Sequence, residues 1–226
     1  MHNWNHVWLK YCDGNSFTGD NASTTTVSGT KLFWRGSRIL DATIASLTSN
    51  TLAPLAKATS VVVGGGSAGG LATFIHCDRW AAAVKANGLS AKYACLADSG
   101  FFLDYEGPPQ PPRFPLYGYH TGMKWAYEQM NSSAGVQQEC QASHAKTGDG
   151  WKCNFAQHTA FFNDAPLFAR QSEFDSWQQG NVLVSSKPAR QLLPRTRPVL
   201  TQFPSTCLRL PLVLMVSVVC VNLPFA

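Results

Sequence analysis

The sequence predicts an α/β fold organised around one tight turn. Residues 59–63 form a short β-branched run, which is typical of a buried parallel strand. A glycine-rich stretch, residues 64–70, follows directly, and a helical pattern continues over residues 71–84. A strand, a glycine turn and a helix in this order predict an α/β unit with a functional turn at its centre.

The other elements are predicted from local patterns. Further strands are expected at residues 6–12 and 93–97, the second ending at Asp98. Further helices are expected at residues 38–52 and 121–131, and residues 167–183 are expected to form a helix or helical turn. Loops are expected at the proline-rich residues 106–115 and at residues 139–165.

Composition narrows the functional classes. The 226 residues are 45% hydrophobic and 14% charged, which suits a folded domain with a real core. The net charge of +5 is not arranged as basic residues interleaved with aromatics, so no nucleic-acid partner is expected. A mild positive charge would suit a polyanionic substrate such as an acidic polysaccharide.

The cysteines favour an oxidising compartment. There are seven, and none forms the CxxC pairs that indicate zinc, so no metal and no cofactor are expected. Disulfides in a secreted protein are the better interpretation, with at least one cysteine left unpaired. Glycosylation sequons at Asn21 and Asn131 are compatible with secretion.

The two ends of the chain differ from its middle. No signal peptide follows Met1, so the chain is expected to lack its true N-terminus. From about Ser185 periodicity disappears, and this tail is expected to be poorly ordered or packed unlike its surroundings. The apolar run at residues 208–221 is shorter than the ~20 residues of a spanning helix and is interrupted by Arg209 and Pro211, so no membrane span is expected.

The central turn carries a catalytic motif. Residues 65–69 fit the G-x-S-x-G nucleophile elbow, with Ser67 as the nucleophile. Small neighbours are needed because the turn leaves no room for side chains. The backbone N–H of Ala68 would face the developing oxyanion at the start of the helix.

Two other glycine-rich motifs fit this stretch less well than the elbow does. No G-K-[ST] follows, which excludes a Walker P-loop. Gly64, Gly66 and Gly69 fit the dinucleotide fingerprint only formally, because no acidic residue stands about 20 positions on and Asp98 is too distant.

A serine nucleophile needs a histidine base and an orienting carboxylate. In this fold class the order is Ser, acid, His, but none of the six histidines follows Asp175. On order alone, Asp98 with His120 or His158 could complete the set. A surface or loop position is the more ordinary explanation of each of these histidines.

Five separated segments resemble one family in order. They are Tyr11-Cys12-Asp13 with Gly19, Phe33-Trp34-Arg35-Gly36, Gly66–Ala72 with His76-Cys77-Asp78, the stretch from Cys95 to Asp104, and the stretch from Ser172 to Gln178. Together they resemble the plant pectin acetylesterases, which are related to the Notum carboxylesterase. The resemblance spans about residues 4–184.

This resemblance implies an α/β-hydrolase-like fold with a central, mostly parallel sheet flanked by helices, incomplete at both ends. It implies deacetylation of pectin (homogalacturonan) in the cell wall by a secreted serine esterase, and the chain is expected to be a monomer. It also implies Ser67 as nucleophile, Asp175 as triad acid, and a structural role near the elbow for Asp98 and Asp104. The implied disulfides are Cys77–Cys95 and Cys140–Cys153, with the partner of Cys12 in a missing N-terminal part.

Departures from the family limit the expected activity. Gly66 replaces a common Cys, the upstream G-G-G-W-C segment is absent, and no histidine follows the segment containing Asp175. Residues 1–184 are therefore expected to form a partial esterase domain and residues 185–226 a divergent tail. The alternatives are a Notum-like lipid or protein carboxylesterase, and an inactive fragment that folds poorly or binds a wall polysaccharide without turning it over.

Overall fold

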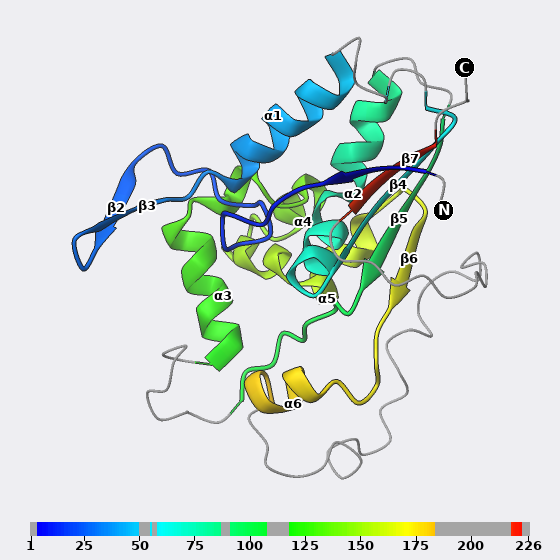
Figure 1. Ribbon diagram of the computed structural model, residues 1–226. Coiled ribbons are helices and arrows are strands. Elements are labelled where there is room, and N and C mark those ends of the chain that lie inside the picture. Colours follow the sequence, from blue (N-terminus) through cyan, green and yellow to red (C-terminus); the bar gives the residue numbers. More distant parts are fainter. Residues whose placement is uncertain are drawn as a thin grey trace.

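The computed structural model describes residues 4–49, 55, 58–86, 91–107, 118–183 and 218–222. Its centre is a five-stranded sheet in the order β1-β7-β4-β5-β6 (Figure 1). The strands are β1 (Asn5–Trp8), β4 (Ser60–Gly66), β5 (Lys92–Asp98), β6 (Leu167–Arg170) and β7 (Val218–Asn222). A separate hairpin joins β2 (Thr24–Val27) to β3 (Thr30–Phe33).

The direction of the strands follows the prediction. β4, β5 and β6 are parallel, and β7 runs antiparallel to both β1 and β4, so only β7 is reversed among the five. The register places Gly66 opposite Asp98 and Asp98 opposite Arg170. These three residues therefore mark one carboxyl edge of the sheet, where sites form in α/β folds. A mostly parallel sheet flanked by helices is confirmed.

The longer helices lie close to where the sequence predicts them. They are α1 (Gly36–Ser49), α2 (Ala68–Ala86) and α3 (Gly118–Gln129). α2 follows β4 directly and is buried around most of its circumference. Leu71, Phe74 and Ile75 pack on one side, while Cys77, Trp80 and Val84 pack on the other. A helix with apolar residues all round is typical of a fully buried position.

Two loop and helix predictions are wrong. Residues 139–165 are not a loop, because they contain the short helices α4 (Gln138–Ser143), η3 (Gly150–Asn154), α5 (Ala156–Thr159) and η4 (Ala160–Phe162), after η2 (Ser132–Ala134). Residues 167–183 are not one helix, because β6 precedes α6 (Ser176–Asn181). Such elements are too short to produce a periodic signal, and β6 is defined by its pairing with β5.

The N-terminal and C-terminal segments also differ from expectation. The hairpin β2–β3 was not predicted, although Ser28 and Gly29 both have positive φ, 49° and 80°, as in a two-residue hairpin turn. Residues 218–222 form a strand within the central sheet, where the sequence predicts none. The remainder of the predicted tail and residues 108–115 of the predicted proline-rich loop lie outside the described residues.

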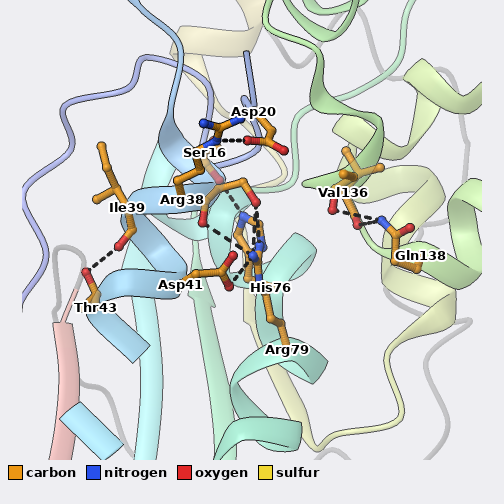
Figure 2. Close-up of polar contacts among 12 residues, drawn as sticks. Ser16, Asp20, Arg38, Ile39, Asp41, Thr43, His76, Arg79, Val136 and Gln138 are labelled. Carbon is orange, nitrogen blue, oxygen red and sulfur yellow. Dashed lines mark hydrogen bonds and ion pairs between the residues drawn. The ribbon is translucent and has the colours of Figure 1, made fainter. Parts of the chain in front are cut away.

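Polar contacts join α1 to the outer part of α2 (Figure 2). Arg79 donates to the Ser37 hydroxyl at 3.1 Å and pairs with Asp41. Nε2 of the fully buried His76 lies 2.9 Å from the Ser16 carbonyl oxygen. The contacts of Arg79 hold α1 against α2, and the contact of His76 holds the loop after β1 against α2. Among the described residues, no helix combines the length and apolarity needed to cross a membrane.

Candidate active site

Ser67 stands alone between the last residue of β4 and the first residue of α2. Its φ is 55°, a left-handed conformation that costs about 1–2 kcal/mol for a residue with a side chain. A Cβ on Gly65 would lie 2.4 Å from the carbonyl carbon of Gly69, so the turn closes only with glycine there. Ser67 itself is exposed. The chain therefore bends sharply and presents this hydroxyl to solvent, as a nucleophile elbow requires.

Backbone hydrogen bonds hold the elbow in place. The Ser67 N–H donates to the Asp98 carbonyl at 2.9 Å, and the Leu71 N–H donates to the Ser67 carbonyl at 3.0 Å. The bond from Leu71 is the first of the helix, so the N–H groups of Ala68, Gly69 and Gly70 have no acceptor within α2. These groups and the helix dipole favour negative charge beside Ser67.

The loop after β1 supports the same turn. The Ser16 hydroxyl donates to the Ala68 carbonyl at 3.0 Å. Asp13 accepts from the N–H of Phe17 at 2.8 Å, and burial raises the pKa of this carboxyl. Ser16 and Phe17 both have positive φ, 51° and 61°. This strained loop therefore also stabilises the elbow, through the hydrogen bond from Ser16 to Ala68.

Asp175 is the N-cap residue of α6, and its carboxylate accepts four hydrogen bonds. Its Oδ1 accepts from the N–H groups of Trp177 at 2.9 Å and Gln178 at 3.1 Å, which caps the helix. Its Oδ2 accepts from the side-chain amides of Gln171 at 2.7 Å and Gln178 at 3.2 Å. Four donors hold this carboxylate in one orientation.

The two glutamines connect Asp175 to the segment after β5. Gln171 accepts from the Phe101 N–H at 3.0 Å. Gln178 accepts from the Leu103 N–H at 3.0 Å and donates to the Phe101 carbonyl at 3.1 Å. Both Ser67 and Asp175 are thus tied to the stretch that runs from Asp98 to Leu103.

His120 and His158 contact a different carboxylate from the one that their order in the sequence suggests. Nδ1 of His120 lies 2.5 Å from Asp104 Oδ1, and Nε2 of His158 lies 2.7 Å from Asp104 Oδ2. Asp98 instead pairs with Arg170 at 3.3 Å. A set made of Asp98 with His120 or His158 is therefore wrong, because Asp104 is the carboxylate that both imidazoles contact.

The environment of Asp104 explains its ionisation. Burial raises the pKa of this carboxyl, but the hydrogen bonds from His158 and His120 outweigh burial and leave the pKa below its ordinary value. No spacing rule in the sequence links residues 104, 120 and 158. Within the described residues, neither Ser67 nor Asp175 is hydrogen-bonded to an imidazole.

Both predicted disulfides are confirmed. Cys77 of α2 is joined to Cys95 of β5, and Cys140 of α4 is joined to Cys153 of η3. Cys12 is free and exposed. Cys140, Cys153 and His144 have donor atoms within 4.8 Å of one another, but the two sulfurs are bonded to each other and offer no thiolate to a metal.

A serine in a left-handed turn between a parallel strand and a helix, at the carboxyl edge of a mostly parallel sheet, defines a protein of the α/β-hydrolase fold. The solved structure of the Wnt deacylase Notum from Drosophila supports this fold, with a TM-score of 0.59 and 22% identity over 74% of this chain and 46% of that chain. The sequence profile of the pectinacetylesterase family matches residues 1–193, and the chain belongs to that family.

Curated relatives agree with the family. Pectin acetylesterase 11 of Arabidopsis thaliana is 31% identical over 183 residues, which are 81% of this chain and 42% of the relative. Pectin acetylesterase 5 of the same plant is 32% identical over 182 residues, 80% of this chain and 39% of the relative. The chain therefore spans about two fifths of the length of these relatives.

Proposed function

We propose that this protein is a secreted serine esterase that removes acetyl groups from pectin in the cell wall. The observation that carries the proposal is the left-handed, exposed Ser67 at the start of α2. The family membership and the plant relatives, which are named pectin acetylesterases, supply the substrate class.

The chemistry is acyl transfer in two steps. The Ser67 hydroxyl oxygen attacks the acetyl carbonyl carbon, and its proton passes to a base and then to the departing sugar oxygen. In this assignment the N–H of Ala68 stabilises the tetrahedral oxyanion. Water then cleaves the acetyl-Ser67 ester and releases acetate. In this assignment Asp175 orients an imidazole base. Among the described residues, no imidazole is hydrogen-bonded to Ser67 or to Asp175.

A matched pair of proteins tests the assignment. Acetate release from acetylated homogalacturonan and from a small aryl acetate would be compared between the wild-type protein and Ser67→Ala. Mass spectrometry of the peptide that contains Ser67 would show whether an acetyl adduct forms with the aryl ester. Ser67-dependent release or an adduct on Ser67 supports the proposal. Equal release by both proteins at a rate above the uncatalysed one, together with an unmodified Ser67, would contradict it.

A second candidate is a carboxylesterase for longer acyl chains. Aromatic rings gather beside Asp175: Phe102 lies 5.1 Å from Trp177 and 5.5 Å from Tyr119, measured between ring centroids. Trp177 is 47% exposed, so part of this apolar cluster is open. A long-chain aryl ester hydrolysed faster than the aryl acetate, again through Ser67, would favour this candidate over the acetylesterase.

A further inference from the structure

Trp151 is surrounded by cationic and imidazole side chains. The ammonium groups of Lys124 and Lys152 lie 5.3 Å and 5.6 Å from its ring centroid. The ring of His120 packs edge-on at 5.0 Å. Trp151 is only 7% exposed, whereas Lys124 is exposed and Lys152 is half-buried. The buried ring thus gathers charges from α3 and η3 at one place on the surface.

Asp104 extends this cluster to two more imidazoles. It bridges His120 and His158, and the ring of His158 lies 5.8 Å from that of His144. The side chains of His120 and His158 are 19% and 23% exposed, while Asp104 is 9% exposed. We call the whole set the histidine–lysine face, which consists of His120, Lys124, His144, Lys152 and His158.

The charge of this face depends on its imidazoles. Its two acidic neighbours are Asp104 and Asp149, and Asp149 pairs with Lys152 at 3.1 Å. With neutral imidazoles, two lysines offset two carboxylates. Each protonated imidazole adds one positive charge to this balance. Other acids on the neighbouring segments are Glu106, Glu128 and Glu139, and within the described residues none of them forms an ion pair with the five side chains.

The environment of His144 moves its protonation to a lower pH than usual. Burial lowers the pKa of His144, the charges of His158 and Lys152 lower it further, and Asp149 opposes them. Asp104 keeps a lowered pKa and so stays ionised between its two imidazoles. Histidine ordinarily changes charge between about pH 5 and 8, whereas carboxylates titrate near pH 4. A polycarboxylate therefore stays ionised through the pH range in which histidine ordinarily changes charge.

We propose that the histidine–lysine face is a docking site for a polyuronate chain with free carboxylates, and that it binds this chain more tightly in mildly acidic solution. The inference rests on the proposed function, in which the substrate is an acetylated polyuronate. Lys124 supplies an exposed permanent charge, and Lys152 supplies a second one that is shared with Asp149. His144 adds charge once the pH falls below its lowered pKa. The face is built on α3, η3, α5 and the end of α4, whereas Ser67 and Asp175 lie at the starts of α2 and α6.

Calorimetric titration with an unacetylated oligogalacturonate tests the face, because this probe has no ester to cleave. At about pH 5.5 and fixed ionic strength, the double variant Lys124→Gln/Lys152→Gln should bind about five- to tenfold more weakly than wild type, since one exposed and one half-buried charge are lost. The matched control is Lys31→Gln/Lys85→Gln, which removes two exposed lysines from β3 and α2 and should bind like wild type. His144→Gln should reduce the gain in affinity between about pH 7.5 and 5.5.

Several results would overturn the docking site. They are unchanged affinity in Lys124→Gln/Lys152→Gln, an equal loss in the control pair, equal binding of a neutral galactan, and an affinity that does not rise on acidification. Ser67→Ala should bind the probe like wild type. If acetate release proves independent of Ser67 while the two lysines still govern binding, the esterase assignment fails and the docking site stands.

Discussion

Gly100 lies against the backbone of Gly70, and this contact joins the segment after β5 to the first turn of α2. A Cβ on Gly100 would lie 2.2 Å from the carbonyl carbon of Gly70. The neighbouring Ser67 N–H is bonded to the Asp98 carbonyl at 2.9 Å. The elbow is therefore held from one side by a close approach of two backbones, which only glycine permits.

Substituting Gly100 should be severely destabilising. Gly100→Ala is expected to lower the free energy of unfolding by about 3 kcal/mol, because neither backbone can move without breaking the elbow. Gly122 of α3 is the control, since nothing lies within 4 Å of a Cβ placed there. Gly122→Ala should raise stability by up to about 1 kcal/mol through helix propensity. Urea unfolding measures both, and similar effects in the two variants would contradict the close contact.

The strain at Ser67 predicts a separation of stability from activity. Ser67→Gly should raise the free energy of unfolding by about 1 kcal/mol, because glycine adopts the positive φ of 55° without steric cost. Ser67→Ala keeps the strain and should leave stability nearly unchanged. Both variants should lose any Ser67-dependent esterase activity. Thermal unfolding of the wild type, Ser67→Gly and Ser67→Ala measures this difference. Equal stability of the two variants would contradict the strain at Ser67.

Asp175 should have separable roles in stability and in catalysis. Asp175→Ala removes the cap of α6 and leaves two glutamine amides without their acceptor, so a loss of about 2 kcal/mol in unfolding free energy is expected. Asp175→Asn keeps a capping oxygen and should lose less. A triad acid replaced by its amide typically costs on the order of 10⁴ in kcat. An Asn variant with full activity would exclude Asp175 as the triad acid.

The buried His76 predicts a loss of stability in acid. Burial lowers its pKa to about 3, with a further contribution from the charge of Arg79. The unfolded chain therefore binds more protons between about pH 6.5 and 3, so stability is complete above that window and falls as pH decreases through it. The slope from this group is about 1.4 kcal/mol per pH unit. His76→Gln keeps a donor toward Ser16 and should flatten the pH profile of unfolding in this range.

Added imidazole should act as a general base for Ser67 and speed the hydrolysis of an aryl acetate. Because no histidine among the described residues is hydrogen-bonded to Ser67, acetate release by this chain is expected to be very slow. Loss of a triad histidine typically costs on the order of 10⁶ in kcat. Free imidazole in solution should increase the Ser67-dependent rate of aryl acetate hydrolysis. The same increase in Ser67→Ala would show only uncatalysed chemistry. A fast reaction without imidazole would direct attention to His120 and His158.

The chain by itself determined the elements whose signal is local. The strand, glycine turn and helix around Ser67 follow from β-branched residues, small residues and helical spacing that are contiguous in sequence. Motif order also assigned the family and, through the resemblance, both disulfides. These features can be predicted from the sequence because each depends on neighbouring residues or on a motif within one segment of the chain.

Features that depend on contacts between distant residues can be seen only in the folded structure. β6 and β7 are strands because they pair with β5 and β4, although their own patterns suggested a helix and an irregular tail. Asp104, and not Asp98, meets His120 and His158, because α3 and α5 are brought to the segment after β5. A side chain's partner is set by which backbones pack together, and residues 104, 120 and 158 carry no local spacing that encodes it.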